Sequence, residues 1–155
     1  MLENIINKLA EKGKKIAVAE SCTGGLLSSK ITDISGASAV FDMGIISYSN
    51  DIKHKFLDVP EETLATYGAV SSQTAEKMAD GVAKAANADY GVSITGIAGP
   101  TGGTREKPVG LVFYAIHDKN KNNTIVTELN LDGNRQEIRE QTCKKVIEKL
   151  NEIIK

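Results

Sequence analysis

The protein has 155 residues, 25% of them charged and 41% hydrophobic, and 19 Lys and Arg against 20 Asp and Glu give a formal net charge of −1. A chain of this length buries roughly 70% of the surface that its unfolded form exposes, which predicts a single domain, residues 1–155, stable without metals or disulfides. The balanced charge disfavours a duplex-binding role but is compatible with a small anionic ligand. No apolar run approaches the roughly 18 residues of a membrane helix, and the charged start is unlike a signal peptide, so we expect a cytoplasmic protein without nucleic acid or membrane partners.

The two cysteines, Cys22 and Cys143, lie far apart in the chain and lack the CxxC spacing of a metal or redox site. We therefore expect neither a disulfide framework nor a bound metal.

The spacing of apolar residues predicts an opening helix with Ile5, Ile6, Leu9 and Ala10 on one face. Further helices are expected at residues 26–34, 51–57, 60–67, 72–86 and 134–154, and strands at residues 16–19, 40–49, 89–95, 109–116 and 124–131.

The order of these elements predicts the fold class. The first three strands alternate with helices, which favours right-handed parallel crossovers, and the polar turn at 118–123 makes the last two strands a hairpin. The result is a three-layer α/β/α sandwich with a mixed, mostly parallel five-stranded sheet. Segments 20–25, 48–53, 95–103 and 132–139 then meet at one sheet edge, where such folds bind their ligands.

The first of these segments contains a candidate nucleophile. Ser21 and Cys22 follow a strand and precede a helix, where free backbone N–H groups and the helix dipole stabilise an attacking oxyanion or thiolate. On local sequence alone a structural reading is favoured, because Ser and Thr cap helices and Gly24-Gly25 permits a tight turn.

The second segment offers a phenol and an amine, Tyr48 and Lys53. Burial lowers the pKa of a lysine by as much as ~3 to 5 units, and a neutral amine can take the proton of a serine hydroxyl. Considered in isolation, Tyr48 is more typical of a half-buried packing residue, and Lys53 is more typical of a solvated charge on a helix.

The remaining segments could hold an anion. The glycines between Gly96 and Gly103 suit a backbone cradle for phosphate, although the spacing is neither Walker A nor GxGxxG, and a purely structural loop is equally compatible. Arg135 and Arg139 lie one turn apart at a helix start, where Glu137 or Glu140 could instead neutralise them. His117 is expected at the opposite edge of the sheet, which disfavours a Ser-His-Asp triad.

Five strings together resemble the C-terminal domain family of CinA, the competence/damage-inducible protein. They are Ala19-Glu20-Ser21-Cys22-Thr23-Gly24-Gly25, Tyr48-Ser49-Asn50 with Lys53, Gly68-Ala69-Val70-Ser71, Ser93-Ile94-Thr95-Gly96-Ile97-Ala98-Gly99-Pro100 with Gly102-Gly103, and Lys107-Pro108-Val109-Gly110. The resemblance covers nearly the whole chain.

The resemblance implies a nicotinamide-nucleotide amidase, which hydrolyses the carboxamide of nicotinamide mononucleotide to nicotinate mononucleotide and ammonia. It implies that Ser21 is the nucleophile, Lys53 its base and Tyr48 a partner that orients or relays the proton. It further implies a metal-independent reaction and a homo-oligomer. Longer relatives carry an N-terminal molybdopterin-binding-like domain, and we expect any activity of that domain to be absent here.

The sequence leaves substrate binding and two rival interpretations open. Candidate binding residues, for the oxyanion or the ribose phosphate, are Thr23, Gly24, Gly25, Thr95, Gly96, Gly99, Gly102, Gly103, Arg135 and Arg139. One rival makes Cys22 the nucleophile, assisted by Glu20 and Lys53. The other is a module of the same fold that binds a nucleotide or a protein without turnover.

Overall fold

The computed structural model describes all 155 residues and contains every helix and strand that the sequence predicts. The elements are α1 (Leu2–Glu11), β1 (Ile16–Glu20), α2 (Leu26–Thr32), the 3-10 helix η1 (Ala37–Ala39), β2 (Phe41–Ile46), α3 (Asn50–Leu57), α4 (Glu61–Tyr67), α5 (Ser72–Ala86), β3 (Tyr90–Gly96), β4 (Leu111–Asp118), β5 (Asn123–Asn130) and α6 (Arg135–Ile153). None of the helices is long and apolar enough to cross a membrane.

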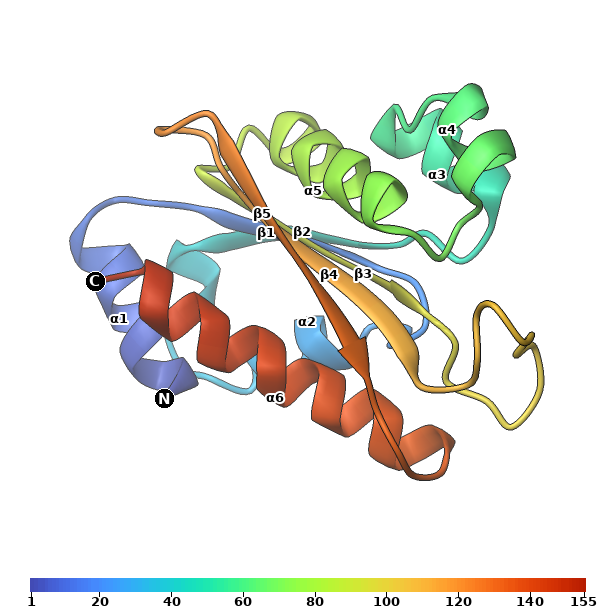
Figure 1. Ribbon diagram of the computed structural model, residues 1–155. Helices are drawn as coiled ribbons and strands as arrows, with labels where there is room; N and C mark the ends of the chain where they lie inside the picture. Colours follow the sequence, from blue (N-terminus) through green and yellow to red (C-terminus); the bar gives the residue numbers. More distant parts are fainter.

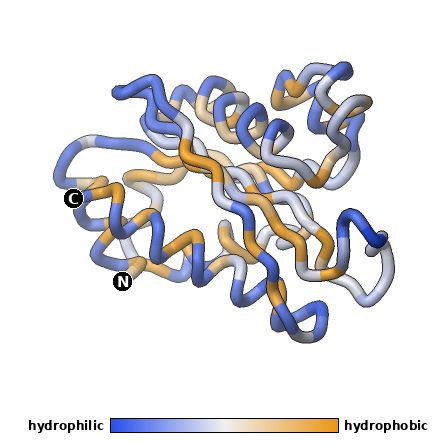
Figure 2. Tube along the Cα trace, viewed as in Figure 1, coloured by the Kyte–Doolittle hydropathy of each residue, from blue (hydrophilic) through white to orange (hydrophobic).

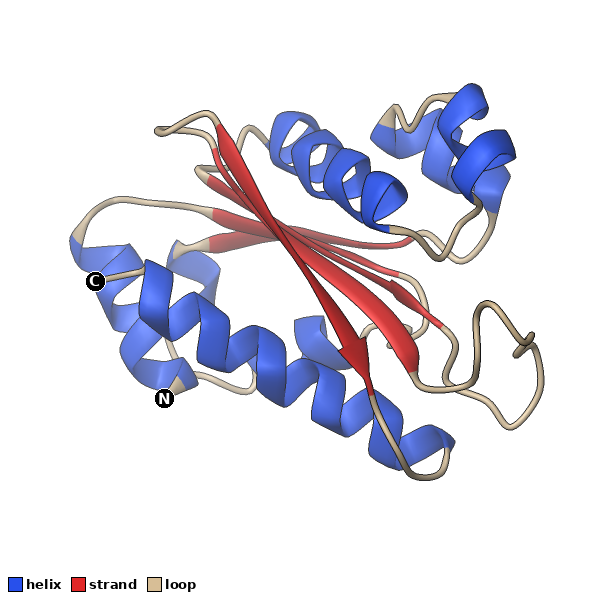
Figure 3. Cartoon of the chain, in the orientation of Figure 1, coloured by secondary structure: helices blue, strands red, loops and turns tan.

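The five strands form one mixed sheet in the order β2-β1-β3-β4-β5. Strand β1 is parallel to both β2 and β3, whereas β4 is antiparallel to β3 and to β5. Helices α1, α2 and α6 cover one face, and α3, α4 and α5 cover the other (Figures 1 and 3). The predicted three-layer α/β/α sandwich is therefore confirmed.

Three predicted strand boundaries are wrong by two or three residues, one of them the end of β4, which lies at Asp118 and not at the predicted residue 116. Strand β2 ends at Ile46, before the predicted residue 49, because Ser49 already caps α3 by accepting the N–H of Ile52 at 3.2 Å. Strand β4 begins at Leu111 and not at Val109, because Gly110 has a φ of +93° and turns the chain before the strand.

The larger core lies between the sheet and the layer of α1, α2 and α6. Alternate residues of the central strands, such as Val18 and Ile94, point into it and are fully buried. Helix α1 contributes its predicted apolar face except for Ala10, which is exposed because the buried stripe follows Ile5 and Leu9. The hydrophobic segments of α6 and the sheet face one another (Figure 2).

On the opposite face of the sheet the central strands carry small residues, which bring α5 unusually close. A Cβ added to Gly91 would lie 2.1 Å from the carbonyl oxygen of Ala79 in α5. The hydroxyl of Ser93 donates a hydrogen bond of 2.6 Å to the carbonyl of Ala75. This close packing places the start of α5, and the residues before it, beside the carboxyl end of β3.

Candidate active site

A cavity of about 330 Å³ opens at the edge of the sheet where β1, β2 and β3 end. All four predicted segments contribute to it. Its lining consists of Ser21, Cys22, Tyr48, Asn50, Lys53, Ala69, Val70, Thr95, Gly96, Ile97, Ala98, Gly99, Thr101, Gly102 and Arg135. Ala69 and Val70, immediately before α5, also line the cavity, although their side chains carry no reactive group that would have predicted this.

Ser21 and Lys53 are in direct contact at the inner end of this cavity. The Lys53 Nζ donates a hydrogen bond of 3.2 Å to Ser21 Oγ and another of 2.7 Å to the carbonyl oxygen of Ser47. Lys53 is only 1% exposed and Ser21 9%. The amine is therefore aimed at the hydroxyl and shielded from bulk water.

Burial changes the acidity of this amine. Desolvation lowers the pKa of Lys53 from its ordinary value of 10.5 to about 8, because a charged ammonium loses its hydration there. An ion pair with a carboxylate would raise the pKa of Lys53 again, but Lys53 forms none. With this pKa about one tenth of the molecules carry a neutral amine at pH 7, and about nine tenths do so at pH 9.

The turn that carries Ser21 is shaped by glycines and by a buried carboxylate. Gly24 and Gly25 have φ angles of +56° and +103°, which favour glycine. The Glu20 carboxylate accepts the backbone N–H groups of Leu27 and Ser28, each at 2.9 Å, and so occupies the free donors at the start of α2. Sequence reasoning missed this role of Glu20.

The structure distinguishes between the two candidate nucleophiles. Burial raises the pKa of Cys22 to about 11, so its thiol stays protonated at neutral pH. The Lys53 amine bonds to the hydroxyl of Ser21, and the Glu20 carboxylate is engaged by α2. The geometry thus supports activation of Ser21 and gives the Cys22 alternative no base.

Tyr48 and Arg135 lie together at the mouth of the cavity. The Tyr48 ring is 62% exposed, and its hydroxyl accepts a hydrogen bond of 3.1 Å from Arg135 Nη2 rather than contacting Ser21 or Lys53. Arg135 Nη1 donates to the carbonyl of Gly99 at 2.7 Å. Arg135 thus joins the start of α6 to the end of the β2 segment and to the glycine-rich loop.

No carboxylate neutralises Arg135. Glu137 hydrogen-bonds to the backbone at the start of α6 in a capping box with Asn134, and Glu140 pairs with Lys30 at 2.8 Å. Because neither acid reaches Arg135, a positive charge without a protein counterion remains at the cavity mouth.

The other predicted binding residues fall into two groups. Thr95, Gly96, Gly99 and Gly102 line the cavity together with Arg135, whereas Thr23, Gly24, Gly25, Gly103 and Arg139 do not. Arg139 instead donates from Nε and Nη2 to the carbonyls of Cys22 and Thr23, at 3.1 and 2.8 Å. The sequence, in which Arg139 simply follows Arg135 by one helical turn, did not indicate that only Arg135 lines the cavity.

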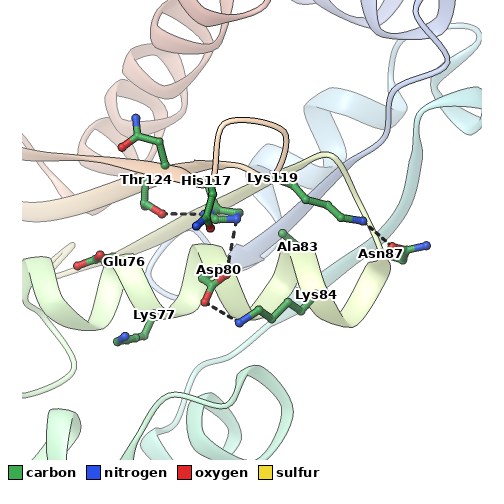
Figure 4. A pocket seen from close by; sticks show the side chains of 11 residues that line it. Glu76, Lys77, Asp80, Ala83, Lys84, Asn87, His117, Lys119 and Thr124 are labelled. Carbon is green, nitrogen blue, oxygen red and sulfur yellow. Dashed lines mark hydrogen bonds and ion pairs between the residues drawn. The ribbon is translucent and has the colours of Figure 1, made fainter.

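A larger cavity of about 550 Å³ lies near the opposite edge of the sheet, between α5 and the β4–β5 hairpin (Figure 4). Several of its polar side chains are bonded to one another. His117 Nδ1 is hydrogen-bonded to Thr124 Oγ1 at 2.8 Å, and Asp80 pairs with Lys84 at 3.1 Å. His117 is thus remote from Ser21, as predicted, and takes no part in a triad with it.

Comparison with known proteins identifies the family. The model of the CinA C-terminal domain matches residues 1–154. The chain belongs to the CinA C-terminal domain family. A CinA-like protein of Kosmotoga olearia is 54% identical over 141 residues, which are 91% of this chain and 34% of that protein. The chain thus spans about a third of the length of the curated CinA relatives it matches.

Solved structures of CinA proteins share the fold. The competence/damage inducible protein CihA from Agrobacterium tumefaciens is 42% identical, with a TM-score of 0.92 over 99% of this chain and 96% of that one. A competence or damage-inducible protein from Enterobacter asburiae, 30% identical, has a TM-score of 0.93 over 99% of this chain and 96% of that one.

Proposed function

We propose that the protein is an amidohydrolase that converts nicotinamide mononucleotide to nicotinate mononucleotide and ammonia. The observation that carries this proposal is the 3.2 Å contact between Ser21 Oγ and the buried Lys53 amine. A hydroxyl beside an amine that loses its proton near pH 8 is an activated nucleophile. The substrate comes from the resemblance to CinA amidases.

In the first step Ser21 Oγ attacks the carbonyl carbon of the carboxamide, and its proton passes to the neutral Lys53 Nζ. The resulting tetrahedral oxyanion collapses, the bond between carbon and nitrogen breaks, and Lys53 returns the proton to the departing nitrogen. Ammonia leaves, and the nicotinoyl group remains as an ester on Ser21.

In the second step water cleaves this ester. Lys53, again neutral, takes a proton from the water as its oxygen attacks the carbonyl, and it returns the proton to Ser21 Oγ as the ester breaks. The Ser47 carbonyl keeps the amine beside Ser21 throughout, because it accepts one of the Lys53 protons at 2.7 Å. The product acid gives its remaining hydroxyl proton to water and is released as the carboxylate.

The phosphate of the substrate requires a cation and free N–H donors near the cavity mouth. Arg135 supplies a guanidinium without a carboxylate partner, and its fork matches phosphate oxygens. The N–H groups of Ala98, Gly99 and Gly102, in the adjacent loop, donate no hydrogen bond within the chain. In this proposal Tyr48 orients Arg135 through its hydroxyl. The cavity volume is within the ~300–1,000 Å³ typical of small-ligand sites.

The test is product formation by the purified chain. Incubation with nicotinamide mononucleotide should yield ammonia and nicotinate mononucleotide in equal amounts, also after treatment with a chelator, and the Ser21→Ala variant should yield neither. Tight binding of the nucleotide without any product would favour the non-catalytic module instead. Assembly into a homo-oligomer stays a prediction, which analytical ultracentrifugation of the same preparation tests.

A further inference from the structure

Arg139 is bonded to the backbone of the nucleophile turn, residues 21–25, and does not line the cavity. It extends from α6, is half-buried, and forms no ion pair with a carboxylate. Its guanidinium donates to two successive carbonyls, those of Cys22 and Thr23, at 3.1 and 2.8 Å. A planar guanidinium presents its donors in a fixed geometry, so these two bonds define the orientation of both peptide groups.

A chain of peptide groups leads from Arg139 to the N–H of Cys22. The carbonyl of Thr23 belongs to the same peptide group as the N–H of Gly24, which donates to the carbonyl of Ser21 at 3.0 Å. That carbonyl in turn shares a peptide group with the N–H of Cys22. Because both peptide bonds are trans, each carbonyl and its partner N–H point in opposite directions. The bond from Arg139 therefore polarises the chain toward the Cys22 N–H.

The N–H of Cys22 lies next to Ser21, where the reaction needs a donor, and within the chain it interacts only with the thiol of Cys22 itself. It donates to no other residue of the chain, and Cys22 lines the cavity next to Ser21. The N–H of the residue after a serine nucleophile lies within reach of the oxyanion that forms on the attacked carbon. Other lining residues also have N–H groups without a partner in the chain, among them Ala69 and Val70 before α5 and Ala98, Gly99 and Gly102 in the loop bonded to Arg135, but the Cys22 N–H is the one adjacent to Ser21 in the chain.

We infer that the Cys22 N–H is a donor of the oxyanion hole and that Arg139 is a positioning residue which holds and polarises it. Arg139 touches no substrate in this arrangement and acts through the turn alone. The inference rests on the proposed function for the identity of the amide, but the role of Arg139 applies to any reaction in which Ser21 attacks and an oxyanion forms.

The first experiment compares Arg139→Ala with the unmodified protein on nicotinamide mononucleotide and on the corresponding riboside, which lacks the phosphate. The kcat should fall ~10- to 100-fold for both substrates with little change in KM, since misplacing a donor affects the transition state. Added guanidinium ion should restore part of the kcat, and Arg139→Lys should retain an intermediate rate. Arg105 is an exposed arginine that does not line the cavity, so Arg105→Ala is the matched control and should leave both kinetic constants unchanged.

Any of three results would overturn the inference. A higher KM for the phosphorylated substrate alone, with the riboside unaffected, would make Arg139 a phosphate ligand. Unchanged kcat values on both substrates, or a loss of kcat that guanidinium does not restore and that follows the loss of folded protein in circular dichroism, would remove the positioning role.

A second measurement separates this inference from the proposed amidase activity. A fluorophosphonate probe labels an activated serine through a transition state that also places negative charge on an oxygen, and mass spectrometry follows its attachment to Ser21. Arg139→Ala should slow labelling by a similar ~10- to 100-fold factor. If the unmodified protein is labelled but releases no ammonia, the proposed substrate is wrong and the inference survives; if both variants are labelled at equal rates, the inference is wrong.

Discussion

Replacing Lys53 by methionine should stabilise the protein at neutral pH while it abolishes turnover. Methionine has a similar length but carries no charge and cannot accept a proton. A lysine pKa that falls from 10.5 to about 8 on folding means that burying the charged amine costs about 3 kcal/mol, at ~1.4 kcal/mol per pH unit. The loss of the hydrogen bond to the Ser47 carbonyl offsets roughly 1 kcal/mol of the gain. We therefore expect Lys53→Met to raise the free energy of unfolding at pH 7 by about 2 kcal/mol.

The sign of this difference depends on pH. The pKa of Lys53 is about 8 in the folded protein and 10.5 in the unfolded chain. The contribution of Lys53 to the free energy of unfolding is therefore complete only above pH 10.5, and it is lost as the pH falls through about 8. The advantage of Lys53→Met should therefore shrink by about 3 kcal/mol between pH 7 and pH 11, and the variant should become the less stable protein at the alkaline end.

Urea unfolding of the two proteins at several pH values measures this difference, because the titration of all other groups cancels between them. At pH 7 the melting temperature of the variant should be roughly 4 to 8 °C higher. A stability difference that is the same at pH 7 and at pH 11 would refute the reasoning, since Lys53 would then be charged or neutral to the same extent in the folded and unfolded protein. Retention of turnover by the variant would contradict its role as the base.

Further predictions concern the site and the sheet. Ser21→Ala should abolish turnover while substrate binding, measured by calorimetry, persists, whereas Cys22→Ala should retain a rate within a few-fold of the unmodified protein. The value of kcat/KM should fall about tenfold per pH unit below pH 8, because only the neutral Lys53 accepts a proton. Arg135→Ala should raise the KM for the phosphorylated substrate at least ~10-fold and leave the riboside unaffected, as steady-state kinetics would show. Gly91→Ala should lower the free energy of unfolding by roughly 1 to 3 kcal/mol or more, because its Cβ would lie 2.1 Å from the carbonyl of Ala79 and α5 must move.

The meeting of Ser21 and Lys53 could be predicted because it follows from topology. Ser21 comes directly after β1, and Lys53 lies in the first turn of α3, the helix that follows β2; the two strands are parallel and pair side by side in the sheet. Parallel neighbours end at the same edge, so a side chain after each strand reaches a common cleft. This arrangement can be deduced from the spacing of apolar residues, the right-handed crossovers between parallel strands and the turn between β4 and β5. Errors of a few residues at the ends of β2 and β4 do not change it.

The different roles of Arg135 and Arg139 could not be predicted from their spacing. The two arginines lie one turn apart on the same helix and have the same chemistry. Their contacts depend on how α6 packs against the sheet, which determines that Arg135 reaches Tyr48 and Gly99 while Arg139 reaches the nucleophile turn. The local sequence does not determine how α6 packs against the sheet, so it could not predict these contacts.

Backbone groups account for most of what sequence reasoning missed. The Ser47 carbonyl that holds the Lys53 amine has no residue-specific signal, because every residue carries a carbonyl. Glu20 was considered only as a helper of Cys22, whereas its carboxylate accepts two N–H groups at the start of α2. Such a cap from a residue six positions before the helix lies outside the usual pattern of capping residues.

The most direct test of the central claim is an NMR titration of the side chain of Lys53 in protein labelled with ¹³C at the lysine ε carbon, with Lys53→Met used to assign the signal. We expect a single ionisation with a midpoint near pH 8, and the same midpoint in the pH dependence of kcat/KM. A midpoint near the ordinary lysine value of 10.5 would mean that Lys53 is fully charged at neutral pH, and it would contradict the assignment of Lys53 as the base that activates Ser21.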